Sequence, residues 1–562
     1  MKDIILKYAL QNAVQFNGKA NQGSVIGKVI GERPELKSDM KALAIETGKT
    51  IKEISSLSVD QQLEKLKQIA PELLEKKEKE EKDIFAFLNI KPGEKVVTCF
   101  PPEPSKYPHI GHAKAILLNY ELAKRNKGMF ILRFEDTNPL LAEKHLYEVH
   151  LENYRWLGIH PDKVENASDY MDQFYQYAEQ LIGKGNAYLC TCSQESIKDG
   201  RYKGIDCPCR SNPIEKNKEL WKKFQTSKEE EMILRLKADM QSSNTVMRDP
   251  TLMRVIDHPH ALTGTKYRLW PTYDFENSVM DGIQGTTHRL RTKEFELRNE
   301  AQRFLQRLLG FKETIINEFG RFNMEGIESS GRIIREKVKS GELLGWDDPS
   351  LNTLVALRRR GFQPSAIKEF VFATGITKNE TVMTWDDLYS HNRKAIDKTS
   401  NRYFFVENPK KVTIKGAPKQ KVELKLHPDF PERGKRAYET HEEFCIAQKD
   451  YDSLEEGKLY RLMDCLNFVM EKKEEQSAIG KFHSSDYDTY KKEGKRIMHF
   501  VPASENVIDT QILMPDKTII AGVSEPLVGG LHADTVIQFE RFGFARLDKK
   551  EGQSAVFWYT HK

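Results

Sequence analysis

The sequence predicts a multidomain protein that combines α/β domains with an all-β region. Three observations support this class: the length of the chain, a strand–helix–strand alternation after residue 93, and short alternating strands near the C-terminus. The chain has 562 residues, which is more than one hydrophobic core usually organises. Hydrophobic residues make up 39% and charged residues 30%, a composition that is typical of globular proteins.

The first 90 residues are expected to form a helical N-terminal domain. Apolar residues recur at helical spacing over residues 4–14 and 63–69. The stretch from Glu75 to Asp83 is wholly charged with mixed sign, which is typical of a solvated helix or a linker, so a boundary is expected near residue 90. The start of the chain has no secretory apolar core, and no run approaches the roughly 20 apolar residues that cross a bilayer. A cytoplasmic location without a membrane partner is therefore expected.

A parallel-sheet α/β domain is expected to follow. Residues 95–100 form a β-rich run that stops at two prolines, a helix is expected over about 111–125, and residues 129–134 form a second strand. Strand, helix and strand within about 40 residues are the unit of a parallel sheet. Because ligands of such sheets bind beyond the carboxyl ends of the strands, a pocket is expected beside residues 109–112 and 135–139.

Two histidines stand at the start of the expected helix, in the segment from Pro108 to His112. The first N–H groups of a helix lack partners and carry partial positive charge, which suits phosphate. Imidazoles at His109 and His112 can donate hydrogen bonds to a nucleotide α-phosphate as charge builds during displacement of pyrophosphate. Gly111 has no Cβ, so a flat adenine can approach the backbone. An isolated pair of this kind is more often a helix cap and a surface residue, so the surrounding motifs decide.

Several longer motifs accompany the histidine pair along the chain. They are residues 100–105, 109–115, 132–139, 270–275, 285–291, 345–349, 357–361 and 538–544. In this order they resemble the motifs of class I aminoacyl-tRNA synthetases, and more narrowly those of the glutamyl and glutaminyl branch. The helical leader and the β-rich C-terminus are similar to those of archaeal/eukaryotic-type glutamyl-tRNA synthetases.

The resemblance implies an enzyme that attaches L-glutamate to tRNA(Glu) through a glutamyl-adenylate, with ATP as substrate and Mg²⁺ on its phosphates. Many archaeal relatives also charge tRNA(Gln) with glutamate, so tRNA(Gln) is a further candidate substrate. DNA is not an expected partner. The net charge is only +5, from 88 basic and 83 acidic residues, so any nucleic-acid surface must be local.

The same resemblance implies a domain order. The expected parts are a helical domain over 1–90, a Rossmann-type catalytic domain over 91–330, an acceptor-end-binding insert over about 190–265, a helical stem-contact domain over 331–395, and anticodon-binding antiparallel β-barrels over 396–562. Short alternating strands in the last part favour such barrels. The run from Arg358 to Arg360 could neutralise phosphates along a tRNA stem, although charge alone equally fits a solvated helix face.

By resemblance, the functional residues fall into two groups. The ATP site would comprise Pro102, His109, Gly111, His112, Ser329, Ser330 and Arg332, of which His109, His112 and Arg332 would be catalytic. The glutamate site would comprise Glu135, Tyr273 and Arg291. A carboxylate at Glu135 suits the α-ammonium group, and the guanidinium of Arg291 can form two parallel hydrogen bonds with a γ-carboxylate.

Two departures from the family pattern concern charge. Cys99 stands where glutamyl enzymes usually carry an arginine that helps to bind glutamate, so we expect recognition to depend more on Arg291 and Cys99→Arg to keep or improve glutamate use. The mobile loop that usually carries a catalytic lysine corresponds to residues 326–332, which contain none. Arg332 is therefore expected to supply the positive charge for the departing pyrophosphate.

Four of the seven cysteines are close in the sequence: Cys190, Cys192, Cys207 and Cys209. An odd total argues against a disulfide framework. Four thiolates can close a tetrahedral structural zinc site, although paired Cys-x-Cys is less diagnostic than paired Cys-x-x-Cys, and free buried thiols are the alternative.

Two rival functions remain open from the sequence. A glutaminyl-tRNA synthetase is the closer rival, and Glu135 together with the helical leader favours glutamate over it. A non-catalytic tRNA-binding protein on the same fold is the other, because of Cys99 and the altered loop.

Overall fold

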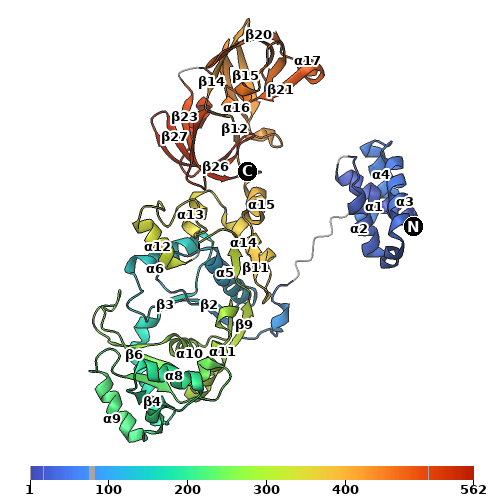
Figure 1. Cartoon of the computed structure of the whole chain (residues 1–562). Coiled ribbons are helices and arrows are strands. Elements are labelled where there is room, and N and C mark those ends of the chain that lie inside the picture. Colours follow the sequence, from blue (N-terminus) through green and yellow to red (C-terminus); the bar gives the residue numbers. More distant parts are fainter. Residues whose placement is uncertain (1, 17, 75–82, 329, 504–505) are drawn as a thin grey trace. The chain divides into compact units, whose positions relative to one another are not determined.

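The chain divides into two units, residues 1–83 and residues 84–562 (Figure 1). The computed structural model describes residues 2–16, 18–74, 83–328, 330–503 and 506–562. Residues 75–82 of the charged stretch and Ser329 of the altered loop lie outside these ranges.

The first unit is helical, as the apolar spacing predicted, and its described residues form four α-helices. They are α1 (Lys2–Gln15), α2 (Gln22–Glu32), α3 (Met40–Ile54) and α4 (Val59–Ile69). Their buried faces share one core that includes Ile5, Leu10 and Leu66. The second unit begins at Ile84, shortly before the expected boundary near residue 90, and Phe85 packs against Val96 within it.

The second unit is built on a five-stranded parallel sheet in the order β3-β2-β1-β8-β9. Its strands are β1 (Val97–Phe100), β2 (Met129–Phe134), β3 (Lys163–Asn166), β8 (His288–Thr292) and β9 (Ile315–Phe319). The predicted strand–helix–strand unit is confirmed, with α5 (Ile110–Arg125) between β1 and β2. The chain places β2 and β3 on one side of β1 and later places β8 and β9 on the other. The sheet therefore has a topological switch point between β1 and β8, which is where ligands of such sheets bind.

Helices and an antiparallel sheet interrupt the parallel strands. The helices are α6 (Lys144–Trp156), α7 (Met171–Gly183), α8 (Gln194–Lys203), α9 (Ile214–Phe224), α10 (Tyr273–Gln284) and α11 (Arg298–Leu309). The antiparallel sheet contains β4 (Ala187–Cys190), β5 (Ile233–Leu236), β6 (Thr251–Val255) and β7 (Leu269–Pro271). Helices α7, α9, α10 and α11 share one core with this sheet, which includes Trp221, Leu234 and Trp270. The sheet extends slightly beyond the predicted insert at both ends.

A helical segment follows the parallel sheet. It contains α12 (Gly331–Lys339), α13 (Leu354–Arg359), α14 (Pro364–Ala373) and α15 (Trp385–Ile396). A two-stranded parallel ribbon of β10 (Phe322–Met324) and β11 (Thr381–Met383) also lies here, which the sequence did not predict.

The arginine run of this segment is mostly structural, contrary to the phosphate-binding interpretation. Arg360 is fully buried, and its guanidinium donates to the carbonyl of Thr560 at 2.8 Å. Arg359 donates to both carboxylate oxygens of Asp548 at 2.9 and 2.8 Å and lies over the ring of Trp558. Only Arg358 of the three is exposed. The run therefore fastens α13 to the C-terminal strands, and at most one of its charges is free for a phosphate.

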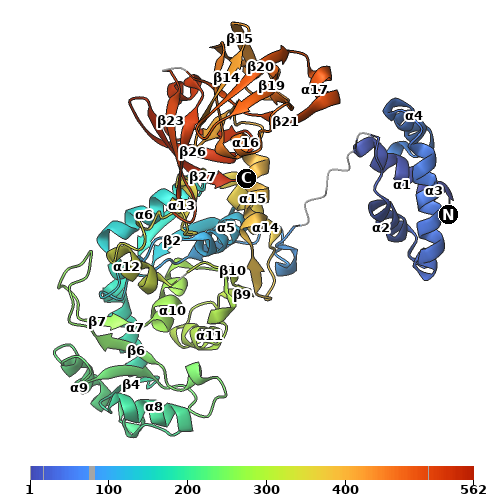
Figure 2. The ribbon, with the colours of Figure 1, turned by 45° about the horizontal axis from the view of Figure 1, so that its top comes forward.

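The C-terminal region is β-rich, as predicted, and its described residues form two seven-stranded sheets and a separate two-stranded sheet of β15 and β16 (Figure 2). Its strands are β12 (Arg402–Tyr403), β13 (Phe405–Glu407), β14 (Lys410–Lys415), β15 (Gln420–Lys425), β16 (Lys435–Thr440), β17 (Glu443–Ile446), β18 (Leu459–Leu462), β19 (Leu466–Lys473), β20 (Ser477–Ser484), β21 (Gly494–Met498), β22 (Val501–Pro502), β23 (Ile508–Leu513), β24 (Ile519–Ser524), β25 (Val536–Phe539), β26 (Gly543–Glu551) and β27 (Ser554–His561). The seven-stranded sheets are mixed rather than purely antiparallel, because β14 pairs with β20 and β23 with β27 in parallel. Such pairings join strands distant in the sequence, which alternation alone cannot reveal.

Within the described ranges, no helix has both the length and the apolar composition that a membrane span requires.

Candidate active site

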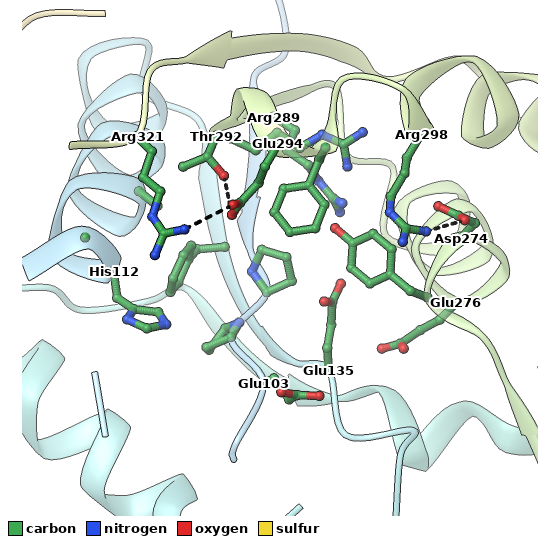
Figure 3. Close-up of a pocket in the computed structure, with 18 of the residues that line it drawn as sticks. Glu103, His112, Glu135, Asp274, Glu276, Arg289, Thr292, Glu294, Arg298 and Arg321 are labelled. Atoms are coloured by element: carbon green, nitrogen blue, oxygen red, sulfur yellow. Dashed lines mark hydrogen bonds and ion pairs between the residues drawn. The ribbon is translucent and has the colours of Figure 1, made fainter. Parts of the chain in front are cut away.

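A cavity of about 950 Å³ opens at the carboxyl ends of the parallel strands. It collects seven of the residues predicted for the nucleotide and amino-acid sites: Pro102, His109, Gly111, His112, Glu135, Tyr273 and Arg291. Figure 3 shows His112 and Arg321 at one end, Arg298, Asp274 and Glu276 at the other, and Glu135 between them. We call these the histidine end and the arginine end. The predicted pocket position is thus observed, and its two ends carry different chemistry.

The histidine end is organised by hydrogen bonds at the start of α5. The N–H of Gly111 donates to Nδ1 of His109 at 3.0 Å, and the N–H of His109 donates to Nδ1 of His112 at 3.2 Å. A ring nitrogen that accepts a hydrogen bond carries no proton, so each neutral ring carries its proton on Nε2. Both imidazoles are thereby set as Nε2–H donors, with ring centroids 4.1 Å apart.

Burial keeps both rings uncharged at neutral pH. It lowers the pKa of His109 to about 3, with smaller contributions from the charges of Lys106 and Arg321. The pKa of His112 is also well below its usual 6.5, mainly through burial and then through His109. Neutral donors with one defined tautomer can bind a phosphate oxygen without a change of protonation.

The structure shows a reason for glycine at position 111 that the sequence did not suggest. A Cβ at this position would lie 2.7 Å from Cε1 and 2.9 Å from Nδ1 of His109. Because these distances are shorter than carbon contacts allow, any side chain here would displace the imidazole. The glycine is therefore needed to hold His109, whether or not an adenine also approaches it.

Glu135 follows β2 and points into the cavity between the two ends (Figure 3). Its N–H donates to the carbonyl of Pro102 at 2.9 Å, which joins the ends of the first two strands. Its carboxylate accepts from Asn277 and lies 3.6 Å from Arg133. Burial raises the pKa of Glu135 to about 7, and the charges of Arg133 and Arg289 oppose this rise. An incoming ammonium group would restore the charged carboxylate.

Arg291 lies at the arginine end with part of its guanidinium unsatisfied. It projects from β8, is 7% exposed, and donates through Nη2 to Asn299. Its Nε and Nη1 atoms are buried without a hydrogen-bond partner among the described residues. Burial lowers the pKa of Arg291. Buried unpaired donors are costly, so these two atoms indicate an anion that the protein itself does not provide.

Tyr273 completes this end as the first residue of α10. Its ring packs on Phe295 at 5.4 Å between centroids, and Arg298 lies 5.2 Å above it. Burial raises the pKa of Tyr273, so its hydroxyl stays protonated and can donate or accept.

Sequence reasoning missed Arg289, which also lines the cavity. It is 2% exposed, donates to Asn277 and Asp281, and has a buried Nε without a partner in the described chain. Arg289 and Arg291 are two residues apart on β8, so their side chains leave the strand on the same face. This period of two was the signal that could have identified Arg289.

Cys99 lies beside this arginine cluster. Its thiol is fully buried on β1 with Val97 and Ile131, and it is not among the cavity-lining residues. Burial raises the pKa of Cys99 to about 11, against the charges of Arg133 and Arg289. The position that lacks the family's arginine is therefore already flanked by two other guanidinium groups.

Only part of the altered loop (residues 326–332) lies at the cavity. Ile327 lines it, Ser330 precedes the first residue of α12, and Arg332 is exposed on that helix. Neither Ser330 nor Arg332 is among the residues that line the cavity. The predicted charge at Arg332 is thus not directed to the histidine end in this conformation.

The four clustered cysteines do come together. The Sγ atoms of Cys190, Cys192, Cys207 and Cys209 all lie within 4.8 Å of one another. Cys207 Sγ is 3.4 Å from the sulfurs of Cys190 and Cys192, and Cys192 Sγ is 3.9 Å from that of Cys209. Sulfurs about 2.3 Å from a tetrahedral zinc ion would be about 3.8 Å apart, so this donor set fits the metal.

Comparisons with protein families match most of the chain after residue 94. Residues 95–398 match the catalytic domain of "tRNA synthetases class I (E and Q)", and residues 400–487 and 484–548 match two anti-codon binding domains of the same description.

Individual relatives match the chain at full length. A glutamate–tRNA ligase of Pyrococcus abyssi is 41% identical, with 100% of this chain and 99% of the relative covered. A glutamate–tRNA ligase of Methanocaldococcus jannaschii is 39% identical, with 100% of both chains covered. A solved glutamate tRNA ligase from Elizabethkingia meningosepticum, in complex with its amino acid, is 19% identical with a TM-score of 0.42, over 55% of this chain and 71% of that one.

Proposed function

Because the chain belongs to the class I tRNA synthetases of the glutamate and glutamine (E and Q) family, we propose that it catalyses the ATP-dependent attachment of L-glutamate to tRNA(Glu). The observation that carries the proposal is one cavity with a buried carboxylate, Glu135, and a buried guanidinium with free donors, Arg291. Glutamate has the matching ammonium and carboxylate groups. The family and its named relatives support an enzyme over a non-catalytic tRNA-binding protein.

Recognition of the side chain rests on the arginine end. Arg291 has two buried donors without partners, which suits the two oxygens of a γ-carboxylate. Glutamine offers one acceptor and a pair of donors, so its amide would leave one arginine donor unsatisfied. Tyr273 and Glu135 would hold the rest of the amino acid. This chemistry and the names of the relatives favour glutamate over glutamine.

Activation of glutamate rests on the histidine end. Pro102, Gly111 and the first turn of α5 would border the nucleotide, and the Nε2–H groups of His109 and His112 would donate to its phosphates. The α-carboxylate oxygen of glutamate would attack the α-phosphorus, and the bond to the bridging oxygen would break as pyrophosphate leaves. Mg²⁺ that accompanies ATP would neutralise phosphate charge. By the family pattern Ser330 and Arg332 would also contact the nucleotide, although they do not line the cavity here.

The remaining parts would bind tRNA. The family matches over residues 400–548 support anticodon binding by the C-terminal strands, and the insert over about 190–265 would hold the acceptor end. The helical domain over about 331–395 would contact the stem through Arg358 rather than through its two neighbours.

The cysteine cluster would hold a structural Zn²⁺ that ties β4 to the segment before α9. Protein purified without chelator is expected to contain one zinc per chain. A strong chelator should lower the melting temperature, and added zinc should restore it. A metal-free protein with the same stability would contradict this site.

Aminoacylation tests the main proposal directly. Total tRNA is incubated with ATP and with radiolabelled glutamate or glutamine, and the charged tRNAs are then separated. Glutamate on tRNA(Glu) is expected. Glutamate on tRNA(Gln) as well would add that tRNA as a substrate. Attachment of glutamine would overturn the amino-acid assignment, and no attachment of either would overturn the enzyme.

A further inference from the structure

Displacement of pyrophosphate needs positive charge at the histidine end, where both imidazoles are neutral. Among the described residues, the charges of Lys106 and Arg321 both lower the pKa of each histidine, so both cations lie near this end. Arg321 shares its charge with Glu294, whose carboxylate lies 3.6 Å away. The ammonium of Lys106 has no hydrogen bond or ion pair with any residue in the described part of the chain. Of these two cations, Lys106 is the one without a carboxylate ion pair in the described part of the chain.

The backbone around Lys106 is fixed from two sides. Nε2 of His150, on α6, hydrogen-bonds to the carbonyl of Lys106 at 2.9 Å, while its Nδ1 pairs with the hydroxyl of Tyr154 at 2.8 Å. From α12, Arg335 donates to the carbonyl of Ser105 at 2.6 Å. The backbone of Lys106 is thus held in place by hydrogen bonds, although the residue belongs to the turn before α5.

The stem of Lys106 also packs against the altered loop. A Cβ added at Gly331 would lie 2.9 Å from Cδ of Lys106, so the glycine leaves room for the lysine side chain at the start of α12. Lys106 lines the cavity together with His109 and His112. Lys106, from the first motif, therefore packs against the loop of residues 326–332, which contains no lysine.

We propose that Lys106 is a further catalytic residue, whose ammonium binds the pyrophosphate that leaves during adenylate formation. This rests on the proposed function. As the carboxylate oxygen of glutamate bonds to the α-phosphorus, the bond from that phosphorus to the β-bridging oxygen breaks, and its electron pair leaves with pyrophosphate. The ammonium of Lys106 stabilises this developing charge by hydrogen bonds and transfers no proton. Burial lowers the pKa of Lys106, so the bound anion also relieves a poorly solvated cation.

The test is pyrophosphate exchange into ATP, with tRNA and glutamate present. Lys106→Gln is expected to lower the exchange rate about 100-fold, as for loss of one charge-stabilising donor, and to raise the KM for pyrophosphate about tenfold. The KM for glutamate should stay within about twofold, because the arginine end is unchanged. Lys106→Arg should recover most of the activity. Lys127→Gln removes the same charge from an exposed turn before β2 and should behave as the parent enzyme.

Three results would overturn the role of Lys106. Unchanged exchange and pyrophosphate KM in Lys106→Gln would do so. So would a loss that Lys106→Arg does not reduce and that a lower melting temperature accompanies, since that indicates packing alone. A higher pyrophosphate KM in Arg332→Ala but not in Lys106→Gln would assign the charge to the loop. Absence of exchange in the parent enzyme would overturn the proposed function itself, and the role of Lys106 with it.

Discussion

The two ends of the cavity prepare for anions in opposite ways. At the histidine end, backbone N–H groups orient two uncharged rings, and each Nε2–H is left free to donate. At the arginine end, charged side chains are buried among one another, and Arg133 and Arg289 share Asp281. Neutral donors cost little desolvation and need only correct orientation. Buried cations are costly until an anion arrives, so they discriminate more sharply between ligands with and without charge.

This difference predicts a larger effect at the arginine end than at the histidine end. Removal of a partner from a buried ionic cluster leaves uncompensated charge in both protein and ligand. Removal of one neutral donor costs one hydrogen bond in the transition state.

Arg291→Leu is expected to have the largest effect. The γ-carboxylate would lose both of its charge-assisted hydrogen bonds, so kcat/KM for glutamate should fall about 1,000-fold or more. Pyrophosphate exchange at varied glutamate measures this fall. Arg307→Leu, which removes an arginine from a surface pair with Glu313, is the matched control and should change little. An unchanged KM for glutamate in Arg291→Leu would contradict the assignment.

His109→Asn should lower kcat about 100-fold while the KM for glutamate stays nearly constant. Asparagine can still accept the hydrogen bond from the Gly111 N–H as a helix cap, but it cannot place a donor where Nε2 lies. His109→Ala should have a similar kcat and should also lose about 1 kcal/mol of stability. Equal melting temperatures for the two variants would show that the cap contributes nothing.

The structure changes the expectation for Cys99→Arg. A third guanidinium would enter a buried region beside Arg133 and Arg289, so we now expect a lower melting temperature and a roughly tenfold loss in glutamate kcat/KM, or about 1.4 kcal/mol. Adding Arg289→Leu to this variant should recover most of the loss by exchanging one cation for another. Cys99→Ser serves as the control of similar size. Improved glutamate use by Cys99→Arg alone would favour the original expectation.

The smallest effect concerns acid stability. The folded pKa values of His109 and His112 lie below the unfolded value of about 6.5. The folded state therefore binds fewer protons than the unfolded state between these pKa values. Their contribution to stability is present above pH 6.5 and is lost as the pH falls towards 3. His109→Asn should therefore show a shallower decrease in melting temperature between pH 6.5 and 4. An identical decrease in parent and variant would mean that folding does not lower the pKa of His109, so that the ring becomes charged in the folded protein as the pH falls.

Local patterns carried much of the prediction. The apolar run before Pro101, the helix that begins at the histidine pair and the strand that ends before Glu135 all appear where their sequences place them. Their positions follow from turn residues and periodicity, and the parallel arrangement then brings their ends to one edge. The location of the cavity was therefore predictable from short segments.

Long-range packing gave several residues a different role. Arg359 and Arg360 resemble a basic helix face in the sequence, but strands about 190 residues away pair with Arg359 and bury Arg360. The sequence predicted that Arg332 supplies positive charge to the cavity. In the structure Arg332 does not line the cavity, whereas Lys106 from another motif does. Nothing local to these residues encodes which distant carboxylate or cavity they meet.

The sequence by itself determined the fold class, the order of the motifs and the chemical types available at the site, because these depend on local periodicity and residue identity. Only the tertiary structure decided which charges are paired, which are buried without partners and which face the cavity. Those properties depend on desolvation and on contacts between distant segments. For this reason Lys106 became recognisable only after the strands and helices were assembled, whereas the spacing of Arg289 from Arg291 on one strand was already visible in the sequence.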